Sequence, residues 1–294
     1  MIFSQQMFCC CRISAFDHLS PNERETVMSY QIRQLSLGGI LDQAVSLTKN
    51  HLGPLFTIVA VTLLPVTLAM SFAQLALLPT ISFPPSMEQL QEYAVAQEKY
   101  GVLFNSLTLL TVLAAIISNA AIVHGIAATY LGKPVTTGGA VGRALRAFFP
   151  LLWTSFLMIV AIMGGFILLI IPGILASLWF VLSTQVVVVE GVSGFKALKR
   201  SKALMKGNIG TLIVLGIVLG AISAGVNLAV LFIPQPHARI VISSLVGGVM
   251  TIFGSAATVV FYFSARCKNE QFDLQLLADN VGAEAVLEPA VENE

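Results

Sequence analysis

Charged residues are scarce in this sequence. Only 11% of its 294 residues are Asp, Glu, Lys or Arg, whereas 56% are apolar. An ordinary soluble domain is about 25% charged and about 45–50% apolar, so this chain has too few polar side chains to cover a water-soluble surface. The sequence therefore predicts a protein surrounded largely by lipid. Its formal net charge of +1 excludes a whole-molecule field that would attract nucleic acid.

Cysteine is also scarce, and its placement excludes a disulfide framework. Cys9, Cys10 and Cys11 are adjacent, and Cys267 follows the last apolar segment, so no spacing fits a disulfide scaffold or a zinc site. The sequence also lacks a phosphate-binding glycine loop, a nucleophile elbow and any metal-spaced cluster of His, Cys or carboxylates. These absences predict a protein that is not an enzyme and has no catalytic, metal or cofactor site.

Long apolar segments are what the sequence has in abundance. A membrane-spanning helix needs about 20 apolar residues to cross a core about 30 Å thick. The uncharged segment from Phe148 to Val189 would form a helix about 63 Å long, so it must cross twice. Pro172 and Gly173 lie near its middle and favour a hairpin there. The predicted spans are 54–78, 102–131, 148–170, 174–189, 210–233 and 240–265.

Basic residues sort to one side of this six-span arrangement. Of the 16 Lys and Arg residues, only Lys99 and Arg239 fall on the other side. Basic loops remain in the cytoplasm when a membrane protein inserts, which predicts a multi-pass protein of the bacterial inner membrane with both termini cytoplasmic. A membrane domain over 35–267 is expected to lie between a disordered tail or over-extended start at 1–34 and an acidic disordered tail at 268–294.

Short amphipathic helices are predicted before the first, third and fifth spans. In the last of these, the apolar side, which includes Ala197 and Leu198, is expected to lie in lipid. The basic side is expected against anionic headgroups and consists of Lys196, Lys199, Arg200 and Lys206. The alternative is an ordinary basic loop without lipid selectivity. The predicted fold class is thus an all-α polytopic membrane protein, with about six transmembrane helices in three hairpins and short cytoplasmic interfacial helices.

Polar residues within the spans are few, and none is charged. Four of them could form a strip that marks a substrate path, or could simply hydrogen-bond between helices: Asn119, His124, Gln185 and Asn227. At the end of the fourth span, Glu190 is expected to pair with Lys196 or to cap the following helix. Stripes of small residues in the fifth and sixth spans fit helix packing, or dimerisation if a stripe faces outward.

The segment from Ile171 to Gly207 carries a recognisable pattern. It contains Pro172-Gly173, then Glu190-Gly191, then Ala197-Leu-Lys-Arg-Ser201 before the next span. This pattern resembles the membrane domain attached to some glycerophosphoryl diester phosphodiesterases and the related YciC-type bacterial inner-membrane proteins. The resemblance implies a six-span fold with inner helices over about Leu35 to Cys267. In the fused proteins a separate soluble barrel performs the hydrolysis, and no such barrel is expected here.

The sequence therefore predicts a non-enzymatic inner-membrane protein that acts as a scaffold or a lipid-associated module. Its expected partners are membrane lipids, anionic ones in particular, or another protein. The rival hypothesis is a small-solute or lipid transporter that uses the polar strip.

Overall fold

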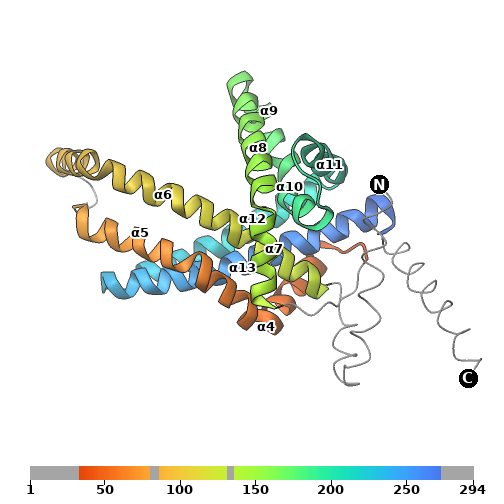
Figure 1. Cartoon of the computed structure of the whole chain (residues 1–294), viewed down its shortest axis with the longest axis horizontal. Coiled ribbons are helices and arrows are strands. Elements are labelled where there is room, and N and C mark those ends of the chain that lie inside the picture. Colours follow the sequence, from red (N-terminus) through yellow and green to blue (C-terminus); the bar gives the residue numbers. More distant parts are fainter. Residues whose placement is uncertain (1–32, 80–85, 131–135, 273–294) are drawn as a thin grey trace, which may run out of the picture.

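A computed structural model describes residues 33–79, 86–130 and 136–272. Within these ranges all regular secondary structure is helical, which confirms the predicted all-α class (Figure 1). Five helices are long and apolar enough to cross a membrane, and a bent pair makes six if it counts as one span. Most of the predicted amino-terminal tail and most of the predicted acidic tail lie outside the described residues.

The first hairpin consists of α4 (Leu37–Thr62), α5 (Leu64–Leu77) and α6 (Met87–Tyr130). The first inner helix and the first span are predicted as separate helices, but α4 joins them across a kink at His51. Pro54 lies inside α4, where a proline removes a helix hydrogen bond and crowds the preceding turn. A second break follows at Leu63, where α4 and α5 meet at 51°. The first span is therefore bent rather than straight.

α6 is much longer than the second predicted span. Its 44 residues correspond to about 66 Å, or twice the thickness of a membrane core. The helix begins with a capping box. The backbone N–H of Gln89 donates to Ser86 Oγ, and the backbone N–H of Ser86 donates to Gln89 Oε1. The extra length precedes the apolar segment, so the first turns of α6 extend beyond the span.

The second hairpin follows α7 (Thr137–Arg146) and contains α8 (Phe148–Leu168), α9 (Ile170–Phe180), the short α10 (Ser183–Gln185) and the π-helix η1 (Val186–Glu190). The turn is at Leu169, whose backbone is extended, and not at Pro172-Gly173 as predicted. Pro172 instead occupies the first turn of α9, where its missing N–H has no partner to lose. Gly173 is buried against the Phe166 ring of α8.

The third hairpin follows α11 (Phe195–Met205) and consists of α12 (Ile209–Leu231) and α13 (Pro236–Glu270). Each hairpin is thus introduced by an amphipathic helix or half-helix, as predicted. In Figure 1 the α8–α9 hairpin projects in a different direction from α5, α6 and α13. The tip of this hairpin is apolar and exposed, and Ile167 there is 82% exposed.

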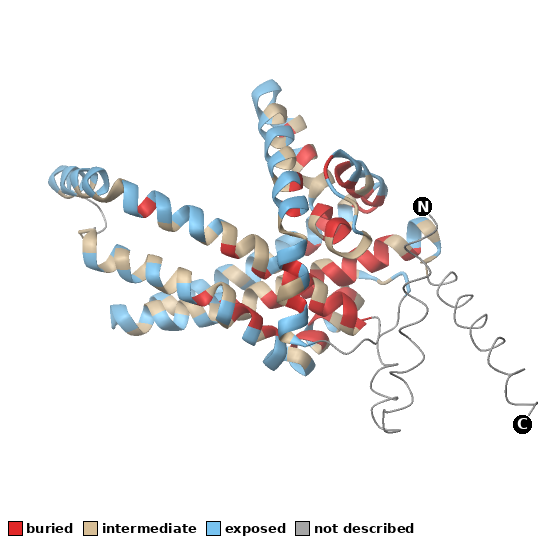
Figure 2. Ribbon diagram, viewed as in Figure 1, coloured by how far each residue is buried: buried red, intermediate tan, exposed pale blue. Residues whose placement is uncertain are grey.

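Buried side chains gather at one end of the molecule (Figure 2). This region is here called the basic end. It consists of α7, η1 and α11, together with the first half of α4 and the carboxyl-terminal parts of α6 and α13. Its core includes the stacked rings of Tyr130 and Phe263, whose centroids are 5.1 Å apart. By contrast, most residues of α8 and α12 remain exposed, as helices surrounded by lipid would be. The packing that fixes the fold is therefore concentrated at the basic end.

The inner helices pack differently from the sequence-based expectation. Their apolar sides are expected in lipid, but they are buried against protein, as Ala44 of α4, Ala140 of α7 and Ala197 of α11 illustrate. The reason is that α13 continues to Glu270 and contacts both α4 and α11, which supplies a protein surface for these apolar sides. The inner helices are thus fixed parts of a folded unit.

Candidate functional site

α11 has one buried and one exposed side. The buried residues recur at the three- and four-residue spacing of a helix and are Ala197, Leu198, Ser201, Leu204 and Met205. The opposite side carries three exposed lysines, and a fourth exposed lysine caps the end of the helix; the four are here called the lysine face: Lys196, Lys199, Lys202 and Lys206. Contacts with α8, α9, η1 and α13 hold the buried side. The lysine face is therefore presented by a helix with a fixed orientation.

Trp179 of α9 anchors the middle of α11. Ser201 Oγ donates a hydrogen bond of 2.7 Å to the Trp179 carbonyl oxygen. The Lys202 ammonium lies 3.9 Å from the centroid of the Trp179 ring, within the range of a cation–π interaction. Ser201 thus has a structural role, and Lys202 remains exposed while its ammonium lies over the indole.

Arg200 is held by two carboxylates. Its Nε donates to Glu190 Oε2 at 2.8 Å, and its Nη2 donates to Glu270 Oε2 at 2.8 Å. Nη1 forms a further hydrogen bond with Glu270. These bonds to Glu270 are the main reason why the pKa of the Arg200 guanidinium is raised, and Glu190 adds to the shift. Arg200 is therefore an internal ion-pair partner and not the headgroup ligand that the sequence predicts.

Glu190 corrects a second expectation. It pairs with Arg200, rather than with Lys196, and it also accepts a hydrogen bond of 2.7 Å from the Tyr262 hydroxyl. On the other side of Arg200, Arg266 Nε donates to Glu270 Oε2 at 3.3 Å. The residues joined in this way are here called the Arg200 network, and they link η1, α11 and α13: Glu190, Arg200, Tyr262, Arg266 and Glu270. Two arginines and two glutamates cancel in formal charge, so the network leaves the charge of the lysine face uncompensated.

The ends of α11 and α13 are fastened together. Lys268 Nζ donates to the Gly207 carbonyl at 2.8 Å and to Asn208 Oδ1 at 3.0 Å. Asn269 Nδ2 donates to the Leu204 carbonyl at 3.0 Å. Carbonyls at the end of a helix have no partner within the helix, and Asn269 supplies a donor to one of them, that of Leu204. The carboxyl end of α13 therefore lies directly beside the carboxyl end of α11.

A π-helix and a glycine turn place Glu190. η1 ends at Glu190, and Gly191 follows with φ +70°, a left-handed conformation that favours glycine. Gly194, with φ +66°, closes the turn, and its N–H donates to Thr154 Oγ1 at 2.8 Å. π-helical turns often occur at functional sites. The sequence indicates the Glu190-Gly191 pair, but nothing in it distinguishes a π-helix from an α-helix.

The four residues of the predicted polar strip lie in different surroundings. Gln185 is buried on α10, and its Nε2 donates to Thr258 Oγ1 at 3.1 Å. His124 Nε2 accepts from Arg143 Nη1 at 2.8 Å. The two that are exposed, on α6 and α12, are Asn119 and Asn227. The four side chains therefore do not share one environment, because Asn119 and Asn227 are exposed and Gln185 is buried.

A different pair of polar atoms stands out in the interior. Among the described residues, Ser118 Oγ and Gln185 Oε1 are buried without a hydrogen-bond partner. Ser118 lies on α6 and Gln185 on α10, and these helices are in contact. An unmet hydrogen bond of this kind costs about 1–3 kcal/mol, and an ordered water commonly supplies the partner. This pair is a feature that sequence reasoning missed.

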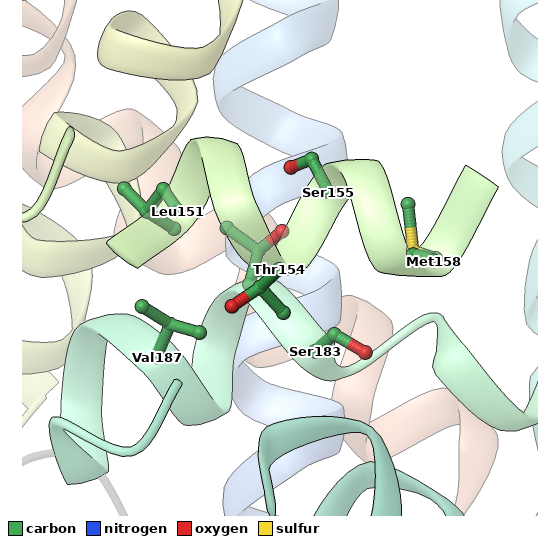
Figure 3. A pocket seen from close by; sticks show the side chains of 7 residues that line it. Leu151, Thr154, Ser155, Met158, Ser183 and Val187 are labelled. Atoms are coloured by element: carbon green, nitrogen blue, oxygen red, sulfur yellow. The ribbon is translucent and has the colours of Figure 1, made fainter. Parts of the chain in front are cut away.

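Two cavities lie outside the Arg200 network. One, between α8 and the α10–η1 segment, has a volume of about 10 Å³ and is lined in part by Thr154 and Ser183 (Figure 3). It has room for about one water. The other, of about 270 Å³, lies at the bend between α4 and α5 and against α13. Thr67 and Thr251 line it, but their hydroxyls donate to backbone carbonyls three or four residues earlier in the chain.

No group of three or more His, Cys, Asp or Glu side chains that could hold a metal ion occurs in the described part of the chain. Comparison with protein-family models, with curated proteins and with solved structures gives no match.

Proposed function

We propose that this chain is a non-enzymatic membrane module of the bacterial inner membrane, whose basic end binds anionic lipid headgroups through the lysine face of α11. The observation that carries the proposal is the contrast between the two sides of α11. The apolar side is buried in protein, while the four lysines of the lysine face are exposed. Because the helix backbone is already fixed, only the lysine side chains lose conformational freedom when they bind an anionic surface.

The electrostatics of the basic end support this function. Glu190 and Glu270 are engaged with Arg200, so the carboxylates nearest to α11 do not neutralise the lysines. A basic residue near an anionic membrane surface contributes about 1 kcal/mol of attraction. Three or four lysines acting together would thus favour anionic over neutral lipid by more than tenfold. The same distribution of basic residues supports a cytoplasmic location for this end.

The rival hypothesis, transport through a polar strip, has less support. Asn119 and Asn227 are exposed, whereas Gln185 is buried and bonded to Thr258. A path that used all four predicted residues would need them on one surface. Headgroup binding needs no rearrangement of the described residues.

Lipid retention by the purified protein tests the proposal. The Lys196→Gln, Lys199→Gln and Lys206→Gln triple variant is compared with wild type for the ratio of phosphatidylglycerol to phosphatidylcholine retained, measured by native mass spectrometry. We expect this ratio to fall at least about tenfold because three headgroup contacts are lost.

A matched control removes the same charge elsewhere. Lys49→Gln, Lys99→Gln and Arg239→Gln together remove three exposed cations that are not on α11. This variant should retain the wild-type lipid ratio. An unchanged ratio in the α11 variant, or an equal fall in both variants, would refute the proposal.

A further inference from the structure

The lysine face has more charge than the described residues around it compensate. The salt bridges among residues 33–79, 86–130 and 136–272 involve Arg200 and Arg266 on the basic side, and none involves a lysine of α11. Lys202 has the Trp179 ring as its neighbour, which is not an anion. A complementary acidic partner would therefore find four ammonium groups available.

Such a partner begins beside α11 in the same chain. The segment 273–294 contains six acidic residues and no basic residue: Asp273, Asp279, Glu284, Glu288, Glu292 and Glu294. Its first residue follows Phe272, whose ring packs on the Arg266 guanidinium at 4.0 Å. Lys268 and Asn269, just before it, are bonded to the end of α11. The acidic segment is therefore tethered at the helix that carries the lysine face.

We infer that the acidic segment 273–294 binds the lysine face of α11 and competes there with anionic lipid. The distance is easily covered, since Lys196 and Lys206 are about 15 Å apart along the helix and the residues from 273 to 284 can span up to about 40 Å. Tethering also gives the segment an effective concentration in the millimolar range at the lysine face. The binding step stands independently of the proposed function, whereas the competition step rests on it.

Zero-length carbodiimide cross-linking tests the binding step directly. This reagent joins a carboxylate to an amine only where the two are in contact, and peptide mapping identifies the pairs. We expect links from acidic residues of 273–294 to Lys196, Lys199, Lys202 or Lys206. Mixing ¹⁵N-labelled with unlabelled protein should show that the links form within one chain. Lys49, which is also exposed at the basic end, serves as the reference lysine.

Two results would overturn the binding step: no link between the segment and α11, or links to Lys49 as frequent as those to the lysine face. A variant with the six acidic residues replaced by Asn or Gln should lose the links.

The same variant tests the competition step. Its retention of phosphatidylglycerol should rise several-fold if the segment competes with lipid. Unchanged retention in this variant, with links present in wild type, would overturn the competition step. If neither form prefers phosphatidylglycerol, the proposed function fails while the binding step stands.

Discussion

Arg200 and Lys199 are neighbours on α11 but have opposite roles. The Arg200 guanidinium points inward to Glu190 and Glu270, whereas the Lys199 ammonium is exposed. A planar guanidinium can bind two carboxylates through several parallel hydrogen bonds, which a lysine ammonium cannot reproduce. One residue therefore fixes the helix, and its neighbour is available to a ligand.

Replacing Arg200 tests this division of roles. Arg200→Gln leaves the partly buried Glu190 without a cation and leaves Glu270 with Arg266 alone, so we expect the free energy of unfolding to fall by about 2–3 kcal/mol. Arg200→Lys should recover only part of the loss because it keeps the charge but not the fork of donors. Equilibrium unfolding in mixed detergent micelles measures both. Lys199→Gln is the control and should change stability by no more than about 0.5 kcal/mol; equal losses in the two Gln variants would contradict the assignment.

Which basic residues of α11 are internal could not be predicted from the sequence. Lys196, Lys199, Arg200 and Lys206 form one basic group on a helical projection. What separates Arg200 from the others is Glu270, which lies 70 residues away and reaches α11 only through the packing of α13. The sequence identifies Glu190 as a structural residue. For the same reason, however, it indicates the wrong partner, Lys196 instead of Arg200.

At the scale of elements, the α8–α9 hairpin depends on two glycines. A Cβ placed on Gly165 would lie 2.9 Å from the Gly173 Cα, which is closer than real Cβ contacts allow. The two backbones therefore approach each other as small residues permit in membrane helices. Gly164, the adjacent residue, has open space where its Cβ would be.

The pair Gly165 and Gly164 provides a matched test. Gly165→Ala should destabilise the protein by about 1–3 kcal/mol because the hairpin backbones must move apart. Gly164→Ala should be neutral or stabilising by up to about 1 kcal/mol, since alanine is the better helix former and meets nothing. Thermal unfolding of the two variants in the same detergent compares them. If Gly165→Ala is as stable as Gly164→Ala, the close approach of α8 and α9 is wrong.

The order of the elements was predictable because apolar length and basic residues determine it. The third and fifth predicted spans, 148–170 and 210–233, differ from α8 and α12 by two residues or fewer at each end. The breaks were less predictable. The kink at His51 lies in the turn before Pro54, where a proline distorts a helix, so the sequence contains its cause. The hairpin, by contrast, turns at Leu169 rather than at Pro172, and no local residue pattern indicates that position.

At the scale of the whole molecule, the packing is uneven. Phe263 is 1% exposed in the core of the basic end, whereas Phe232, at the end of α12, is 87% exposed. Lipid tails are as apolar as these side chains, so an apolar side chain gains little free energy by contacting protein instead of lipid. The spans therefore contribute less to stability than the basic end does. The basic end should behave as the rigid part of the structure.

Two phenylalanine variants test this distribution. Phe263→Ala removes a buried ring stacked on Tyr130, so we expect a loss of about 3–5 kcal/mol. Phe232→Ala should change stability by no more than about 0.5 kcal/mol because the ring contacts little protein. Unfolding in mixed micelles gives both values. A comparable loss at Phe232 would show that stability is spread along the spans.

Trp179 can report on the proposed binding of anionic headgroups to the lysine face, because the Lys202 ammonium lies over its ring. In a Trp153→Phe background Trp179 is the one remaining tryptophan of the two in the sequence. Its fluorescence is measured in vesicles of brominated phosphatidylglycerol and of brominated phosphatidylcholine. If the lysine face binds anionic headgroups, quenching should be stronger with the anionic lipid, and should become equal with both lipids after Lys196, Lys199 and Lys206 are replaced by Gln. Equal quenching by both lipids with the lysines intact would contradict this binding.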